Sequence, residues 1–204
     1  MIRAIVFDLG RVLIDFDFNI AIERLKKRAP VNPIKLLTFF SAHSPAVDFD
    51  RGVLGEREFF SAIQKEMNLP LSMEEFIVLW NEIFTEKKAM ADWAKSLKGK
   101  YKIGILSNTN PWHLQHLKKK HGWVFEFDAF VGSCEVQMMK PNPRIYRHIL
   151  EKLGVAPEET FYVDDIAENV AAAKNLGMDA VQFKDEASFF IEVYLKRYVL
   201  SFQV

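Results

Sequence analysis

Ile5-Val6-Phe7-Asp8 is a short apolar run that ends on a carboxylate. Two further apolar runs along the chain also end on polar side chains. They are residues 103–106 before Ser107-Asn108 and residues 161–163 before Asp164-Asp165. Runs of this kind are typical of buried parallel strands, because both faces of such a sheet are covered. The carboxyl ends of parallel strands lie at one edge of the sheet, where ligands bind in open α/β folds. The three runs therefore predict one shared site.

A fourth polar island, Lys140 before Pro141, stands in a turn-like stretch between the second and third runs. Each island taken alone has an ordinary structural interpretation, as a capped strand or a turn. All four arriving at one sheet edge by accident is improbable. Together they indicate a phosphate-handling site, and hence an enzyme.

The composition is typical of a small globular enzyme. Half of the 204 residues are hydrophobic, and 27 basic residues balance 27 acidic ones. Because nucleic-acid and membrane-surface binders need surplus positive charge, we expect neither partner. The single cysteine, Cys134, excludes an intramolecular disulfide and a multi-thiolate metal site. No leader or membrane-spanning stretch is visible, so we expect a cytoplasmic protein, as a monomer or a weak dimer.

The order of elements predicts an α/β core that a helical segment interrupts after the first strand. Residues 16–87 contain no convincing strand and predict helices over 20–27, 33–40, 56–67 and 72–84, the last with a Ser72/Glu75 capping box. From residue 88 onward strands and helices alternate, which predicts βαβ units and a parallel sheet. The expected strands are 101–107, 128–132, 160–164 and 179–183, and the expected helices are 90–97, 111–121, 143–153, 167–176 and 187–199.

Four segments carry a resemblance to a known family. They are Phe7-Asp8-Leu9-Gly10-Arg11-Val12-Leu13, Leu106-Ser107-Asn108-Thr109-Asn110, Lys140-Pro141-Asn142-Pro143-Arg144-Ile145-Tyr146 and Val163-Asp164-Asp165-Ile166-Ala167-Glu168-Asn169. With these motifs the chain resembles the haloacid dehalogenase-like (HAD) hydrolase superfamily, in particular its phosphatases typified by α-D-glucose-1-phosphatase. The resemblance implies a Rossmann-like parallel sheet with helices on both faces. It divides the chain into a core, residues 1–15 and 88–204, and a small helical cap, residues 16–87.

The chemistry expected of the site starts from Asp8. A carboxylate can attack phosphorus and form an aspartyl-phosphate, which divides one difficult step into two. Neighbouring carboxylates repel unless a cation lies between them, so Asp164 and Asp165 imply a metal, and oxygen ligands beside a phosphate suit Mg²⁺. The resemblance makes Asp165 the main metal ligand beside Asp8, with Asp164 and the backbone carbonyl of Gly10 assisting. Asn169 is expected to orient a carboxylate or metal-bound water; an ordinary polar helix residue is the alternative.

The phosphate itself is expected to meet Ser107 and Asn108 through the hydroxyl and backbone N–H groups, at the start of a helix near Pro111. Lys140 is expected to contact both Asp8 and the phosphate as a point charge. Arg51, between helical segments of the cap, is a candidate for binding the substrate, with an exposed arginine as the alternative. The cap aromatics are expected to form the interior of the cap, as a lid over the site: Phe39, Phe40, Phe59, Phe60 and Trp80.

Gly10 departs from the common pattern of the superfamily, which places a general-acid aspartate two residues after the nucleophile. Because a general acid contributes about 10²–10⁴-fold, its absence favours substrates with better leaving groups, such as sugar 1-phosphates. Asp15 or Asp17 is an alternative proton source. The expected function is a Mg²⁺-dependent phosphatase of a small phosphorylated metabolite. The alternatives are a catalytically weak phosphometabolite sensor and a 2-haloacid dehalogenase, whose chemistry needs no metal.

Overall fold

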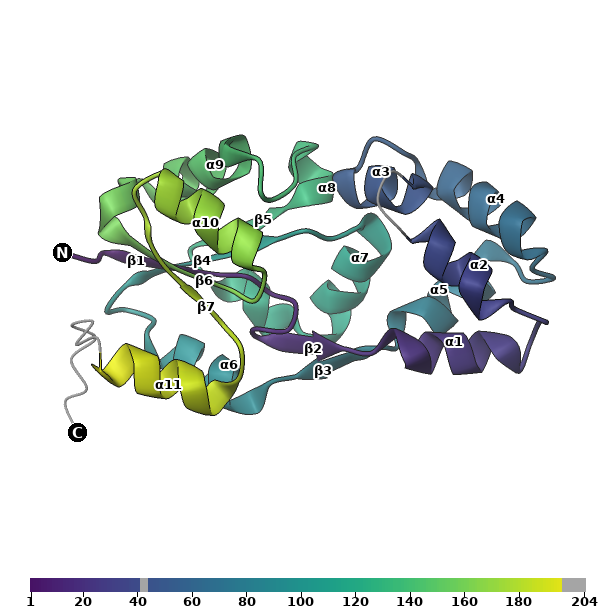
Figure 1. The fold of residues 1–204 in the computed structure, drawn as a ribbon, viewed down its shortest axis with the longest axis horizontal. Helices are drawn as coiled ribbons and strands as arrows, with labels where there is room; N and C mark the ends of the chain where they lie inside the picture. The colour runs from purple at the N-terminus through teal and green to yellow at the C-terminus, as the bar shows by residue number, and fades with distance from the viewer. Residues whose placement is uncertain (41–43, 196–204) are drawn as a thin grey trace.

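The computed structural model describes residues 1–40 and 44–195, and a five-stranded parallel sheet lies at its centre (Figure 1). The strand order is β5-β4-β1-β6-β7. The bounds are β1 Ala4–Phe7, β4 Lys102–Ser107, β5 Ala129–Gly132, β6 Thr160–Asp164 and β7 Asp179–Gln182. Each expected core strand is present, so the predicted α/β class with a parallel sheet is confirmed.

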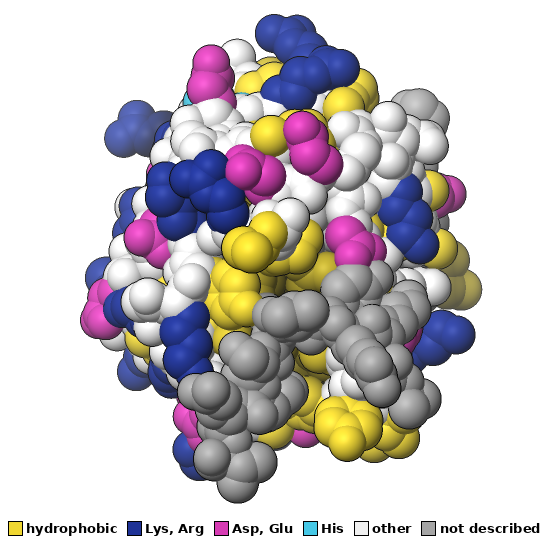
Figure 2. Space-filling view, turned by 90° about the vertical axis from the view of Figure 1, so that its left-hand side faces the viewer, with side chains coloured by type: hydrophobic (Ala, Val, Ile, Leu, Met, Phe, Trp, Pro, Cys, Tyr) yellow, Lys and Arg dark blue, Asp and Glu magenta, His cyan; other side chains and the backbone are white. Residues whose placement is uncertain are grey.

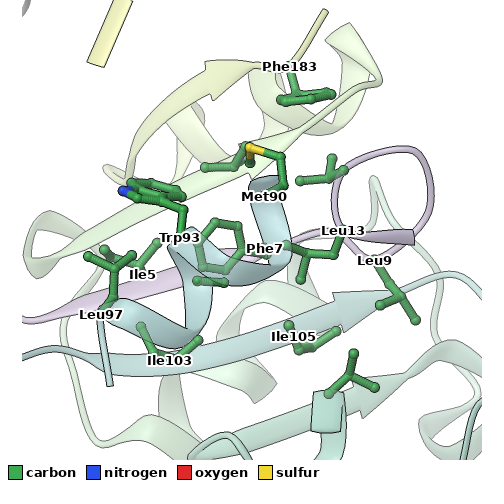
Figure 3. Close-up of a cluster of buried hydrophobic side chains, with 14 of the residues drawn as sticks. Ile5, Phe7, Leu9, Leu13, Met90, Trp93, Leu97, Ile103, Ile105 and Phe183 are labelled. Atoms are coloured by element: carbon green, nitrogen blue, oxygen red, sulfur yellow. The ribbon is translucent and has the colours of Figure 1, made fainter. Parts of the chain in front are cut away.

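The strands are apolar on both sides because helices cover both faces of the sheet. In β1, Ile5 and Phe7 belong to one buried cluster, and Ala4 and Val6 belong to the other. Figure 3 shows Phe7 beside Trp93, whose ring meets it edge-on with centroids 5.6 Å apart. The first face is covered by α6 Lys88–Ser96, α7 Pro111–Lys120 and α11 Glu186–Leu195, and the second by α9 Pro143–Leu153 and α10 Ala167–Asn175. The end of the predicted helix over 187–199 lies partly outside the described residues.

The cap lies at one end of the core in Figure 1 and has a hydrophobic cluster of its own. Its helices are α1 Phe18–Lys26, α2 Pro33–Phe39, α3 Pro45–Arg51, α4 Glu56–Met67 and α5 Met73–Asn81. The predicted capping box is confirmed: Glu75 N–H donates to the Ser72 hydroxyl, and Ser72 N–H donates to the Glu75 carboxylate. The helices expected over 33–40 and 56–67 are present with nearly the same bounds.

The expectation that residues 16–87 contain no strand is wrong. β2 Ile14–Phe16 pairs antiparallel with β3 Phe84–Glu86, and this ribbon connects the core to the cap (Figure 1). The helix expected over 72–84 therefore ends at Asn81. Strands of three residues leave too short a pattern to read, and their pairing joins segments far apart in sequence. The proposed domain boundaries, 15/16 and 87/88, fall beside this ribbon.

Short elements complete the described chain: α8 Ser133–Val136 and the 3₁₀ helices η1 Gly122–Glu126 and η2 Pro157–Glu159. On the core face that points away from the cap, basic and acidic side chains are interspersed (Figure 2). Within the described part of the chain, no helix is both long enough and apolar enough to cross a bilayer.

Candidate active site

The carboxyl ends of three neighbouring strands bring the predicted polar residues together. Phe7 pairs with Val163 in the register of β1 and β6, so the following residues, Asp8 and Asp164, leave the sheet side by side. Ser107 ends β4 on the other side of β1. The backbone N–H of Asp8 donates to the Val163 carbonyl at 2.8 Å, which extends the ladder by one residue. Regular sheet geometry therefore positions the site.

Lys140 is the cation at the centre of this edge. Its Nζ lies 2.7 Å from Asp8 Oδ1 and 2.7 Å from Asp164 Oδ2, and its side chain is 1% exposed. It reaches the sheet from the loop before α9, as the motif order predicts. Asn108 holds that loop: its Oδ1 accepts from Lys140 N–H at 2.9 Å, and its Nδ2 donates to the Lys140 carbonyl at 3.1 Å. Since the Asn108 amide is used in this way, its backbone N–H is the group that remains for a phosphate.

The site carries more negative than positive charge. Burial raises the pKa of Asp8 to about 7, and Asp164 adds to the effect, although the Lys140 ammonium opposes it. Burial lowers the pKa of Lys140, but Asp8 and Asp164 outweigh it, and the pKa is raised overall. Burial and Asp164 also raise the pKa of Asp165. Three carboxylates share one ammonium, so a further cation would be stabilised among them.

Asp164 is fully buried and engaged by four donors. Besides Lys140, it accepts from the Tyr162 hydroxyl, from the N–H of Ile166 at 2.8 Å and from Asn169 Nδ2 at 3.0 and 3.1 Å. Asn169 thus lies against a carboxylate, where the sequence placed it. Tyr162 was not expected in the site, because in sequence it is only one residue of an apolar strand. Both carboxylate oxygens of Asp164 thus accept hydrogen bonds, and the side chain lies against Lys140.

The donor set fits a hard divalent cation. Carboxylate oxygens of Asp8, Asp164 and Asp165 lie within 4.8 Å of one another, and Mg²⁺ is bound through one or two carboxylates plus phosphate and water. Asp165 is only half-buried and borders the same cavity as Asp8, so it is the carboxylate most available to a metal. Gly10 borders this cavity too. Predicted ligand roles for these residues agree with the geometry and remain predictions.

A cavity of about 350 Å³ opens over these groups. Its walls combine residues expected in the site with three that sequence reasoning missed, Arg11, Phe16 and Ile166. The guanidinium of Arg11 lies 5.2 Å from the centroid of the Phe16 ring. Ser107 and Asn108 form the wall toward α7, whose first turn is capped by Asn110 and begins with Pro111. A helix N-terminus of this kind favours an anion. The cavity therefore presents cations, a helix start and a carboxylate nucleophile to one phosphate-sized space.

The Phe16 ring lies directly against Gly10 and leaves little room for a side chain there. A Cβ atom at position 10 would lie 2.9 Å from Phe16 Cε1, closer than side chains tolerate without moving. The aromatic ring of β2 thus occupies the space next to the position where relatives in the superfamily were expected to carry an acid. The other candidate acids lie elsewhere: Asp17 caps α1 through the N–H of Asn19, and Asp15 borders a neighbouring polar cavity.

Arg51 lies on α3 with an exposed side chain, 3.7 Å from Asp48. Arg51 does not border the cavity over Asp8, nor a second cavity of about 210 Å³ that lies beside the first one. A role of Arg51 in substrate binding therefore stays a prediction without a supporting contact. Its neighbour Asp50 does face the second cavity, where Asn110 donates to it at 3.0 Å. In the sequence, Asp50 and Arg51 are equally good candidates for an exposed or a cavity-facing side chain. Only the orientation of α3 shows that Asp50 borders a cavity and that Arg51 does not.

Comparisons with known proteins find a family and relatives that match most of the chain. A family model described as haloacid dehalogenase-like hydrolase matches residues 2–177. A D-ribitol-5-phosphate phosphatase of Bacteroides thetaiotaomicron is 28% identical over 93% of this chain and 95% of its own length. A sesquiterpene phosphatase, AstK of Aspergillus oryzae, is 25% identical over 94% of each chain. The chain spans 35% or less of three other curated relatives that it matches.

A crystal structure of similar fold also comes from Bacteroides thetaiotaomicron. It is a HAD-family enzyme in complex with magnesium and inorganic phosphate, with a TM-score of 0.82 and 27% identity over 93% of this chain and 99% of that one. The family model and the similar crystal structure thus both point to HAD-family proteins.

Proposed function

Because the chain belongs to the haloacid dehalogenase-like hydrolases, we propose that it is a Mg²⁺-dependent phosphatase that acts through an aspartyl-phosphate on Asp8. The enzyme class predicted from the sequence, a phosphoric monoester hydrolase of this family, is confirmed. The observation that carries the proposal is the buried Asp8–Lys140–Asp164 contact, with Asp165 beside it at the edge of the sheet.

In the first step Asp8 attacks the phosphorus atom. Leu9 N–H and Lys140 Nζ both donate to Oδ1 of Asp8, at 2.7 Å each, so we assign the attack to Oδ2. An O–P bond to Asp8 forms as the ester P–O bond breaks, and the departing alkoxide takes a proton from the solvent side. In the second step water attacks phosphorus, Asp8 leaves as a carboxylate, and inorganic phosphate is released.

The remaining residues hold the phosphoryl group. Lys140 supplies a fixed positive charge, and the Ser107 hydroxyl with the N–H of Asn108 donates to the phosphoryl oxygens. When bound to Asp8 and Asp165, Mg²⁺ would offset the charge that develops on those oxygens. Asp164, fixed by Tyr162 and Asn169, keeps Lys140 oriented toward Asp8.

The substrate class is a small phosphorylated metabolite. Two relatives that match most of this chain are named for a sugar-alcohol phosphate and for a sesquiterpene phosphatase, so they leave the nature of the alcohol open. The sugar 1-phosphate suggested by Gly10 stays a prediction; equal turnover of primary alkyl phosphates and sugar 1-phosphates would exclude it. A cytoplasmic location and a monomeric or weakly dimeric state also remain predictions.

The test is phosphate release from a panel of phosphate monoesters by the wild type and by Asp8→Asn, each with Mg²⁺ and with chelator. We expect turnover that requires the metal and is lost in the variant. Silence of the wild type across the panel would support the sensor alternative. Activity that survives complete chelation would support the dehalogenase alternative.

A further inference from the structure

A second cavity, of about 210 Å³, lies between the core and the cap, directly beside the one over Asp8. The two cavities share four wall residues: Gly10, Phe16, Ser107 and Asn108. These four include the expected phosphate ligands. A phosphate monoester held over Asp8 would therefore place the organic part of its ester in this second cavity.

Aromatic rings form most of the cap-side wall. Phe40 and Trp80 are stacked with ring centroids 4.7 Å apart, and Phe49 and Phe59 are stacked at 4.2 Å. Phe18 also borders the cavity, with its ring 5.2 Å from that of Trp80. Several of these residues were expected to form only the interior of the cap. Their position makes the cap-side wall mainly apolar, with the Asp50 carboxylate as its charged group.

A buried polar atom of one residue that lines the cavity, on the core side, has no hydrogen-bond partner. His113 borders the cavity, and its Nε2 is buried and unpaired. Asn110 fixes the tautomer of this ring. The Oδ1 atom of Asn110 accepts from the backbone N–H of His113 at 2.9 Å. The Nδ2 atom of Asn110 therefore faces Nδ1 of the His113 ring, at 3.1 Å, and donates to it. Burial lowers the pKa of His113 to about 3, so the ring is neutral near pH 7. A neutral ring that accepts at Nδ1 carries its proton at Nε2, which leaves an unused donor.

We propose that the preferred substrate is a phosphate monoester of an apolar, ring-bearing alcohol that carries one oxygen acceptor for His113 Nε2. The proposal rests on the phosphatase function above and specifies its substrate class. An apolar cavity of about 150 Å³ can hold a benzene ring, so the 210 Å³ here accommodates a ring with a short substituent.

A polyol phosphate fits this cavity poorly. Each of its several hydroxyl groups needs a partner once it leaves water, whereas the side chains described in the cap-side wall are mainly aromatic. Asn110 is already engaged with Asp50 and His113. Specific pockets usually combine an apolar lining with a few placed polar groups, and the lining here has that composition. The cavity therefore favours an apolar alcohol over a sugar.

The experiment compares two phosphate esters of primary alcohols, benzyl phosphate and ribitol 5-phosphate, with the wild-type enzyme and Mg²⁺. We expect kcat/KM to be at least about tenfold higher for the benzyl ester, a typical size for hydrophobic discrimination. Acetyl phosphate, which is too small to need the second cavity, reports on the phosphatase function alone. Turnover of acetyl phosphate without a benzyl preference would overturn the proposal and leave the phosphatase function standing.

Binding gives a readout that does not depend on turnover. Calorimetry with benzylphosphonate and with 2,3-dihydroxypropylphosphonate should show tighter binding of the benzyl compound, even if the enzyme turns out to hydrolyse none of the esters. In that case the phosphatase function fails and the assignment of the cavity stands. Equal or weaker binding of the benzyl compound would overturn the assignment.

Two variants locate the effect in the cavity. Ala46 on α3 borders it and is buried, so Ala46→Leu should lower kcat/KM for benzyl phosphate relative to acetyl phosphate by about tenfold. The matched control is Ala62→Leu on α4, which lies in the cap but not at the cavity. His113→Phe should abolish a preference of about three- to tenfold for 4-methoxybenzyl over 4-ethylbenzyl phosphate. No such preference in the wild type would remove His113 from the proposal.

Discussion

The sheet edge of the core and the cavity under the cap lie side by side and are built in opposite ways. At the edge, Lys140 is almost fully buried between two carboxylates, and Asp164 has four donors. Under the cap, stacked aromatic rings form most of the wall, and polar groups are few, among them the unpaired Nε2 of His113. At the edge, the buried charged side chains of Lys140 and Asp164 are held by hydrogen bonds. The cavity is bounded mainly by aromatic side chains, so we expect it to select ligands by their shape.

From this difference we expect that the edge serves catalysis and that the cavity serves substrate selectivity. A residue at the edge should affect every substrate alike, because all share the phosphoryl group. A residue of the cavity should change the ranking of substrates, because only the alcohol reaches it. The predictions below test this division, and the largest effects are expected at the edge.

Lys140→Met should have the largest effect. It leaves two buried carboxylates unpaired, so we expect kcat/KM to fall by more than about 1,000-fold for all substrates, and the free energy of unfolding to fall by about 3 kcal/mol. Phosphate release and urea unfolding measure the two effects. The control is Lys88→Met, which removes an exposed ion pair between Lys88 and Asp92, 2.6 Å apart. This control should change neither kcat/KM nor the free energy of unfolding appreciably. Activity of Lys140→Met within tenfold of the wild type would contradict the proposed role.

Gly10→Asp tests why the general acid is missing. Alone it should not raise turnover, because its Cβ meets the Phe16 ring. Combined with Phe16→Ala, it should raise kcat for benzyl phosphate by about 100-fold over Phe16→Ala alone, within the range of general-acid catalysis. Single-turnover release of the alcohol measures this step. If Gly10→Asp alone gives the gain, the ring is no obstacle.

Tyr162→Phe should lower kcat by about tenfold and leave KM unchanged, since outer hydrogen bonds that orient a charged site have effects of this size. The lost hydroxyl donates to Asp164, which in turn contacts Lys140. The matched control is Tyr146→Phe, because the Tyr146 hydroxyl donates to a backbone carbonyl, that of Asn169 at 3.0 Å, and not to the Asp164 carboxylate. An equal loss in both variants would mean that general packing, and not the orientation of Asp164, is responsible.

Asp50→Asn should have the smallest effect, and the effect should be seen in the free energy of unfolding. Burial raises the pKa of Asp50 to about 6, although Asn110 opposes the shift. A raised pKa means that the stability contributed by the protonated form is complete below about pH 4 and is lost as the pH rises through 6. The variant should therefore be about 1–3 kcal/mol more stable than the wild type at pH 8, and equal to it near pH 4. Urea unfolding at both pH values measures this, with Asp48→Asn on the exposed side of α3 as the control.

Much of the edge could be predicted from the sequence because its signals are local. A buried parallel strand is an apolar run, and the residue that follows it lies at the sheet edge. Asp8, Ser107 and Asp164 are found in this way, and the helices that cover the sheet follow from their 3.6-residue periodicity. The ribbon of β2 and β3 could not be predicted, because two three-residue strands joined across the whole cap have no local pattern.

The sequence by itself determined the α/β class and the cap insertion and named the candidate catalytic residues, because each depends on a short pattern of neighbouring positions. Only the tertiary structure decided which aromatic side chains border the cavity, because a buried ring has the same sequence signal whether it meets another side chain or an empty space. Likewise it decided that Phe16 stands against Gly10, that Asp50 rather than Arg51 faces inward, and that Asn110 leaves His113 Nε2 as a donor. Such relations depend on how the cap is seated on the core, and no stretch of sequence contains both sides of that contact.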